Sequence, residues 1–493
     1  MRFVQQLNKK NPFRGDYLPS RVSLFARNRV SLPFPHLWNY REPIRILDAY
    51  FQSVDDLDKS AKHNRYLDVP FFPAVLVSRD PTVIKAILLD TGDKPGQFDR
   101  DTLPTDGIAR ATGEDSLLYS NGEQWRMQKK LAAPSFGKTK LFQPEKFAEF
   151  EQTFRKTAAD RLEILREQQT AAHASITPIE LEPEISAIML EMLVNNFFGG
   201  NVSYLDIQER YVPSLTFMID HMVTDTIAHR IQKPINFITG KHQRLKDAEQ
   251  DFEALTDIAL AGRGEHLGMW SQFKSDATDE QLRSNIRVFL AGALEATTSF
   301  AGWTFTHLAR SPEMQEAIYK EVESMDVYDP DNLAQASSLL QALQETLRLT
   351  PSLYFLPRRA TIDTTVKVGP DSKLIIPKGT HVLLDVWHAN RCEDFWGEAV
   401  SGYPATEFVP QRWQVLKDKG YSAKELMHFG FGFGPRTCPG TSLGMLEVGL
   451  VVGAFVKMFR FTADARAVEP RAGVSTKPSD GVTINIEVRE PYQ

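Results

Sequence analysis

The sequence predicts a mainly α-helical fold with a smaller β-rich lobe, arranged around one long central helix. Thr278 and Gln281 form a capping box, and Ser311-Pro312 is a stop signal. The roughly 30 residues between these signals would span about 45 Å as a helix, enough to cross the molecule. Strand patterns at about residues 65–80 and 360–385 indicate the β-rich lobe.

The remaining elements follow from hydrophobic spacing and from breaker residues. Pro70 and Pro73 limit the strands of residues 67–80 to edges or short pieces, and residues 94–115 are rich enough in Gly, Pro, Asp and Thr to predict a long loop. A strand-turn-strand is expected at residues 376–380 and a hairpin at residues 475–482. Helices are expected at residues 81–89, 142–168, 185–198, 204–225, 339–349 and 440–458.

Length and composition indicate an ordinary soluble globular protein. The 493 residues divide into a basic N-terminal segment, residues 1–40, and a single domain, residues 41–493, with two packed lobes. The net charge of −6 gives no reason to expect nucleic acid as a partner. The N-terminal segment lacks the apolar run of a membrane helix or a signal peptide. We therefore expect a soluble, cytoplasmic protein, with peripheral membrane contact through the basic segment left open.

The chain has two cysteines, Cys392 and Cys438, and no Cys-x-x-Cys spacing. This excludes a zinc cluster built from cysteines and fits a reducing compartment, although one disulfide between the two stays open.

Cys438 lies in a glycine-rich loop, residues 428–440, just before a helical pattern. Gly434 and Gly440 would allow tight backbone turns, and Phe431 would keep water from the sulfur. The start of the helix at Thr441 or Ser442 and the nearby Arg436 would favour a thiolate. A buried thiolate in an apolar shell suits a soft metal ligand; the alternative is an inert core cysteine.

The spacing Phe431-x-x-Gly434-x-Arg436-x-Cys438-x-Gly440 resembles the haem-binding loop of the cytochromes P450. This resemblance covers about residues 65–490 and implies a P450-like fold, with haem b ligated by the Cys438 thiolate. It also implies that Trp125, Lys129 (where arginine is usual) and Arg358 hold the haem propionates. Glu345, Arg348 and Arg412 match the family's structural triad.

The centre of the long helix carries the candidate catalytic residues. Counting back from Pro312, the resemblance places Glu295 at the family's acid position and Ala296 at its alcohol position, followed by Thr297. A second alignment makes Thr297 the alcohol and Ala296 the acid. In either case half of the usual acid–alcohol pair is missing. By position, the substrate pocket would be lined by Phe217, Met218, His221, Gly292, Leu353, Tyr354, Phe355 and Leu356.

The resemblance predicts a monooxygenase or oxidase acting on a small, lipophilic organic molecule. Since no flavin or nicotinamide segment follows Cys438, electrons would come from a separate ferredoxin or flavoprotein reductase. Arg126, Lys129 and Lys130 are the candidate contacts for that partner. The missing relay group also favours an alternative, a peroxide-using or isomerase-type enzyme. A non-catalytic haem sensor is disfavoured, because the long helix and the loops build a substrate chamber.

Overall fold

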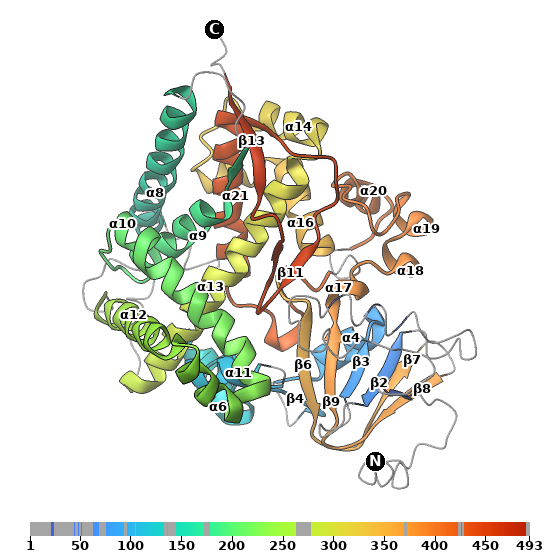
Figure 1. Cartoon of the computed structure of the whole chain (residues 1–493). Coiled ribbons are helices and arrows are strands. Elements are labelled where there is room, and N and C mark those ends of the chain that lie inside the picture. The colour runs from blue at the N-terminus through green and yellow to red at the C-terminus, as the bar shows by residue number, and fades with distance from the viewer. Residues whose placement is uncertain are drawn as a thin grey trace.

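The protein has a large helical lobe and a smaller lobe built on a sheet (Figure 1). The structure is a computed structural model. It describes residues 21–23, 44, 48, 51, 63–68, 75–92, 96–103, 105–132, 136, 144–171, 178–262, 278–368, 372–422, 425 and 428–489. Of the N-terminal segment 1–40, only β1 (Arg21–Ser23) lies within the described residues.

The long central helix is confirmed as α13 (Asp279–Leu308), which runs through the helical lobe in Figure 1. The Thr278 hydroxyl accepts from the Gln281 amide at 3.3 Å, and the Gln281 side chain accepts from the Thr278 amide at 3.0 Å. Both halves of the predicted capping box are therefore formed. At the other end, Pro312 begins the next helix, α14 (Pro312–Val322).

Other helices pack around α13. The predicted helices are found as α4 (Pro81–Leu89), α8 (Pro144–Ala171), α9 (Glu182–Glu191), α11 (Val212–Ile238), α16 (Ser337–Leu349) and α21 (Thr441–Met458). Further helices are α6 (Gly122–Ala132), α12 (Lys241–Ala261), α17 (Val386–Ala389), α18 (Glu393–Trp396), α19 (Glu398–Ser401) and α20 (Arg412–Asp418). Two π-helical segments, Met192–Phe197 and Ile207–Tyr211, continue α9 and precede α11.

The expected long loop at residues 94–115 is wrong in part. This stretch contains β4 (Phe98–Arg100) and α5 (Asp106–Thr112). Ile108 and Ala109 are buried in the helical core, and Phe98 is buried in the core of the β lobe. Tertiary burial thus outweighs the local turn-forming composition.

The smaller lobe holds a six-stranded sheet with the order β1-β2-β3-β9-β6-β4. Its strands include β2 (Asn64–Asp68), β3 (Val75–Ser78), β6 (Phe355–Ala360) and β9 (His381–Asp385). The predicted strand-turn-strand is confirmed as β8 (Ser372–Ile376) followed by β9; β8 pairs with β7 (Thr364–Val368). The predicted hairpin region holds β11 (Pro470–Ala472) and β12 (Thr476–Pro478), and it reaches α13.

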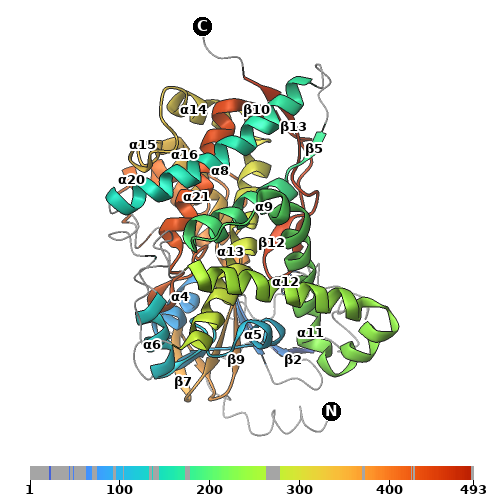
Figure 2. The same cartoon turned by 90° about the vertical axis from the view of Figure 1, so that its left-hand side faces the viewer.

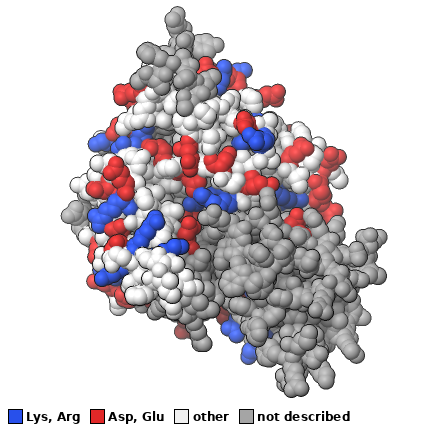
Figure 3. All heavy atoms as spheres, viewed as in Figure 1, with Lys and Arg blue, Asp and Glu red and all other residues white. Residues whose placement is uncertain are grey.

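Among the described residues, α21 is long and apolar enough to cross a membrane. Of its residues, 72% are buried inside the protein, and its neighbours include α13, α14 and α16. Such burial is typical of the core helix of a globular domain. On the face shown in Figure 3, described acidic and basic side chains are interspersed rather than gathered by sign.

Candidate active site

The loop before α21 fixes the position of Cys438. Its backbone amide donates to Phe431 O at 2.9 Å, and its carbonyl accepts from Thr441 Oγ1 at 2.7 Å. Residues Gly434–Arg436 form a single 3₁₀ turn between these two anchors. The helix begins at Thr441, as expected. The sulfur is therefore presented by a loop that is tied at both ends.

The two glycines of the motif have different roles. Gly434 has φ +73°, and a Cβ there would stand 2.6 Å from Leu88 O, so no other residue fits without a backbone shift. Gly440 has an ordinary φ of −77°, which corrects the expectation of a special backbone angle. A Cβ on Gly440 would lie 3.7 Å from the Cys438 sulfur, so this glycine leaves space beside the thiol.

The environment of the thiol differs from the expectation. Burial raises the pKa of the Cys438 thiol, and the backbone amide of Gly440 opposes this only in part. Arg436 does not supply the expected cation, because its guanidinium donates to Ser120 O and Asn121 Oδ1 instead. Cys438 nevertheless keeps accessible surface. A side chain that is both accessible and desolvated lines an interior surface, where a bound cation would stabilise the thiolate.

Three arginines gather beside this loop. Arg100 of β4 stands directly opposite Arg358 of β6 in the antiparallel register, and Arg436 lies next to both. Burial and mutual repulsion lower the pKa of Arg358 well below its usual value. The same two effects lower the pKa of Arg436 to about 9. Burial also lowers the pKa of Arg100. Like charges opposite each other in a sheet destabilise it, so this arrangement needs an anion.

The arginine cluster has the donors to hold such an anion. The Nε atoms of Arg100 and Arg436 are buried without a hydrogen-bond partner. The side-chain hydrogen bonds of Arg358 and Arg436 in the described structure go to a hydroxyl, to backbone carbonyls and to an amide oxygen rather than to a carboxylate. Haem carries two propionate groups, and buried guanidiniums with unused N–H groups are suited to bind carboxylates. The donor set therefore fits haem.

Trp125 and Lys129 lie against the same cluster. Trp125 is almost fully buried, with the Arg436 guanidinium 4.3 Å from its ring centroid. Lys129 Nζ donates to Pro435 O at 3.2 Å and stands 4.8 Å from the Trp125 ring. The structure thus brings both residues to the thiol loop, where their propionate contact stays a prediction.

The middle of α13 carries an accessible stripe on a helix that is otherwise mostly buried. Five residues at helical spacing keep exposed surface on one face: Phe289, Gly292, Ala293, Ala296 and Thr297. Further along this face, Phe300 meets Phe431 of the thiol loop with ring centroids 6.3 Å apart. At the other end, Phe136 packs against Phe289 and lies beside Gly440. The stripe therefore belongs to the same interior surface as the thiol.

Glu295 is held on a different face of α13. Its carboxylate accepts from Ser475 Oγ at 2.7 Å and from Lys477 Nζ at 2.9 Å. Ser299, one turn later, donates to Thr476 O. At about 100° per residue, Glu295 is rotated about 140° from Phe300. The structure thus brings Ala296 and Thr297 to the interior surface and separates Glu295 from them.

The structure brings the predicted triad together, with all three side chains fully buried. Arg348 donates to both oxygens of Glu345 at 2.7 and 2.9 Å. Arg412 Nε donates to Glu345 Oε1 at 3.2 Å. Arg348 also donates to Asn390 O and Ala405 O, which ties the network to the chain leading to the thiol loop.

The predicted pocket residues on α11 do not gather at the thiol. Phe217 faces α12, with the Arg244 guanidinium 4.0 Å from its ring, and both line a surface depression. Met218 is buried in the helical core. Asn236 Nδ2 lies 3.1 Å from His221 Nε2, a contact that spans 15 positions. These positions would cover about 22 Å in a straight helix, so α11 bends between them. Figure 2 shows α11 and α12 projecting from the body of the molecule.

The segment after α16 lies closer to the site. Ser352 Oγ donates to Ala296 O at 2.9 Å, which places the start of this segment beside the accessible stripe. Leu353, Tyr354 and Phe355 keep partial exposure, and the Tyr354 hydroxyl donates to Gly473 O. Leu356 instead packs in the core of the β lobe. The strand alternation that begins at Phe355 turns Leu356 away.

Sequence reasoning missed Arg100 and Lys477. Both stand far along the chain from their neighbours in the site, and neither lies in a motif. The predicted loop and the predicted hairpin that contain them hold other charged residues as well, so no local signal distinguished Arg100 or Lys477.

Known proteins with similar sequences point to the same kind of site as the geometry does. Residues 51–483 match the family described as "Cytochrome P450". A "Cytokinin hydroxylase" of Arabidopsis thaliana is 25% identical over 394 residues, 75% of this chain and 70% of the relative. An "11-oxo-beta-amyrin 30-oxidase" of Medicago truncatula is 24% identical, covering 88% of this chain and 82% of the relative. With the Cys438 thiol, the buried arginines and the long helix in place, this match over most of the chain shows that the protein belongs to the cytochrome P450 family.

Proposed function

We propose that the protein is a haem-thiolate monooxygenase that oxidises a small, lipophilic organic molecule with dioxygen. The observation that carries this is the Cys438 sulfur on an interior surface shared with the apolar stripe of α13. Two of the relatives are named for action on a cytokinin and on a β-amyrin derivative, both small organic molecules. The stripe offers mostly apolar contact, which favours a lipophilic substrate.

In this proposal the residues of the chain divide the work of holding the cofactor. Cys438 would ligate the iron, and Arg100, Arg358 and Arg436 would bind the propionates, supported by Trp125 and Lys129. Haem with a thiolate ligand supplies dioxygen activation and O–O bond cleavage. Phe431 and Phe300 pack against each other, and with haem bound they would help to exclude water from the thiolate.

Proton supply would rest on Thr297 rather than on Glu295. The Thr297 hydroxyl donates to the carbonyl of Ala293, one turn back, so Oγ1 presents its lone pairs on the accessible stripe, where it would accept a hydrogen bond from the group that carries the proton. Ala296 offers no hydroxyl, and Glu295 is occupied by Ser475 and Lys477 on another face. A substrate hydroxyl or an ordered water would complete the relay.

Electrons would come from a separate protein that docks on α6. Arg126 and Lys130 are exposed there, and Lys129 links this helix to the thiol loop through Pro435 O. A negatively charged ferredoxin or reductase surface fits these cations.

Ligation is tested with carbon monoxide bound to the reduced protein. Native protein should show the long-wavelength absorption band of thiolate haem, and Cys438→Ala should lose it. A Cys438→Ala protein that retains the band would contradict the proposal, whereas Cys392→Ala should retain it as a matched control.

The second candidate function is a peroxide-using or isomerase-type enzyme. It is favoured by one observation, namely that the accessible stripe carries no acid and Glu295 is paired elsewhere. Turnover with dioxygen and a surrogate reductase, compared with turnover with peroxide alone, separates the two functions.

The ratio of product formed to reductant consumed, measured in Thr297→Ala and Ala296→Thr, tests the relay. We expect Thr297→Ala to uncouple dioxygen turnover, and unchanged coupling would mean that Thr297 is not part of the relay.

A further inference from the structure

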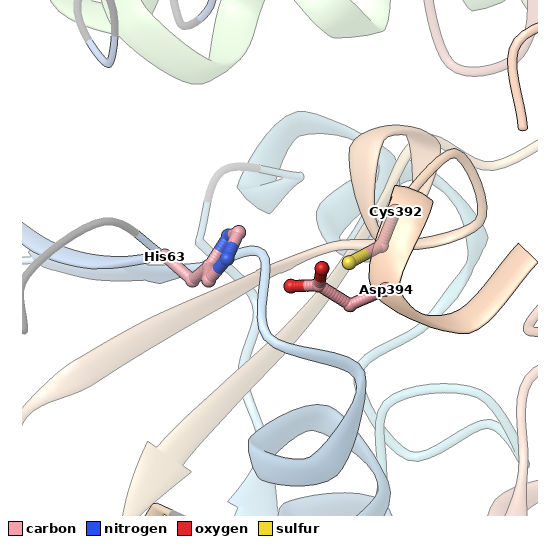
Figure 4. A group of neighbouring side chains, drawn as sticks. All are labelled: His63, Cys392 and Asp394. Atoms are coloured by element: carbon pink, nitrogen blue, oxygen red, sulfur yellow. The ribbon is translucent and has the colours of Figure 1, made fainter. Parts of the chain in front are cut away.

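Three side chains of different chemistry meet at the junction between β2 and α18, outside the candidate active site. They are His63, just before β2, and Cys392 and Asp394 at the start of α18 (Figure 4). One ligand atom of each lies within 4.8 Å of those of the other two. In Figure 4 the sulfur and the carboxylate lie side by side, and the His63 ring lies across from them.

The backbone holds the three residues in place. The carbonyl of His63 accepts from the Arg79 amide at 2.7 Å, and the carbonyl of Cys392 accepts from the amides of Phe395 and Trp396 at 3.1 and 2.9 Å. Because Cys392 and Asp394 stand at the start of one short helix, their separation is set by local structure. His63 reaches them from a segment more than 300 positions away.

The charges around the cluster favour a cation. The Asp80 carboxylate acts electrostatically on Cys392 and is fixed by accepting from the amide of Thr82 at 2.9 Å. The guanidiniums of Arg79 and Arg391 are engaged with other groups. Arg79 pairs with Asp385 at 2.8 Å, and Arg391 stacks on the ring of Trp387 at 3.8 Å.

We propose that His63, Cys392 and Asp394 form a binding site for a divalent transition metal, with Zn²⁺ as the best fit. Zinc accepts nitrogen, thiolate sulfur and carboxylate oxygen as ligands in a tetrahedral arrangement. Bond lengths of about 2.0–2.3 Å put tetrahedral ligand atoms about 3.3–3.8 Å apart. Rotation of the exposed Asp394 side chain and a shift of about 1 Å close the site. Water takes the fourth position, and the Cys392 thiol releases its proton on binding.

The site connects to the frame that supports the thiol loop. Trp396, at the end of α18, accepts a hydrogen bond from Arg412, and the Arg348 guanidinium lies 5.4 Å from its ring. Asn390, two positions before Cys392, accepts from the Phe429 amide at 3.0 Å. Zinc would therefore fasten β2 to the segment that braces the cysteine loop, and it would stabilise the haem-loaded fold.

The first test is a zinc titration of the haem-loaded, chelator-treated full chain, in which Cys438 is occupied by iron. We expect one equivalent of Zn²⁺ to bind and the melting temperature to rise. Cys392→Ser, His63→Gln and Asp394→Asn should each weaken binding by about tenfold or more. Glu398→Gln, which changes an exposed acid on neighbouring α19, should bind as the native protein does. Native-like binding by the three variants, or no stoichiometric binding by the native protein, would overturn the proposal.

X-ray absorption at the zinc edge supplies an independent readout that haem iron does not obscure. The spectrum should show one sulfur at about 2.3 Å and lighter ligands at about 2.0–2.1 Å. A spectrum with only nitrogen and oxygen neighbours would refute the site.

If Cys392→Ser does not fold, the rate at which Cys392 is alkylated tests the site instead. Zn²⁺ should slow iodoacetamide labelling of Cys392 in native protein but not in Asp394→Asn. If native protein is labelled at the same rate with and without Zn²⁺, the proposal is contradicted.

Discussion

At the scale of single residues, repulsion within the arginine cluster should lower the stability of the haem-free protein. Arg100 and Arg358 face each other across two strands, and Arg436 adds a third buried positive charge. Folding around haem would offset this repulsion. If the cluster binds haem as proposed, its repulsion should appear as reduced stability of the haem-free state.

Arg100→Met should separate these two effects. Removing one of three repelling charges should raise the melting temperature of haem-free protein. Losing a charge-assisted contact should lower haem affinity by roughly 1.5–3 kcal/mol, or about ten- to a hundredfold. Calorimetry of the haem-free protein and haem titration give the two values. Arg359→Met, an exposed neighbour on β6, serves as the control. A haem-free Arg100→Met protein that melts lower than the native one would refute the repulsion argument.

Glu447 predicts the pH dependence of stability. It is buried on α21, its Oε1 has no hydrogen-bond partner, and burial raises its pKa to about 8. Between the unfolded pKa of 4.5 and about 8, the folded state holds a proton that the unfolded state has lost, so stability falls as pH rises. At pH 7 the loss is roughly 3 kcal/mol. Glu447→Gln should recover it at pH 7 and gain nothing near pH 4.5, as measured by urea unfolding. An equal gain at both pH values would exclude titration as the cause.

At the scale of elements, α13 is joined to the hairpin strand β12 by a buried ion pair. Lys477 Nζ lies 2.9 Å from Glu295 and 3.7 Å from Glu182. Burial opposes the charge of Lys477, but the two carboxylates outweigh it and raise the pKa of the ammonium. This pair fixes the rotation of α13, and with it the face that carries Thr297.

Lys477→Met should destabilise the protein by about 3–5 kcal/mol, because it leaves Glu295 buried and weakly compensated. The double variant Lys477→Met/Glu295→Gln should regain much of this loss, since no charge is left unpaired. Denaturant unfolding of the two single variants and the double variant measures the coupling. Additive losses would mean that the two residues act independently.

At the scale of the whole molecule, the triad joins α16 to the irregular chain that leads to Cys438. Glu345 also accepts from the Trp413 indole and from the Val409 amide, both at 3.1 Å. With its arginine partners, it connects segments more than 60 positions apart.

Glu345→Ala should therefore cost about 3–5 kcal/mol and yield protein that holds little haem, because two arginines lose their buried counter-ion. Haem content and melting temperature report the effect. Glu323→Ala, at an exposed acid after α14, should leave both unchanged. Full haem content with normal melting in Glu345→Ala would rule out the bracing role.

Local sequence determined much of this protein. The capping box and the proline set the ends of α13, and the glycine–arginine–cysteine spacing set the thiol loop. The triad could be predicted as well, since Glu345 and Arg348 are three residues apart on one helix and Arg412 belongs to the matching family motif. For the helix ends, the thiol loop and the Glu345–Arg348 pair the decisive residues are close in the chain, so short-range geometry is enough, whereas Arg412 could be assigned only through the family resemblance.

Only the tertiary structure decided which groups meet across the chain. Arg100 becomes part of the arginine cluster through strand register, and His63 meets Cys392 because the fold brings the residue before β2 close to the residue before α18. The helical period of α13 fixed the angle between Glu295 and Thr297, but not which of them faces the thiol. That rotation depends on the partners of Glu295 in β12, about 180 positions later. Periodicity gives relative angles, whereas absolute orientation comes from burial against distant elements.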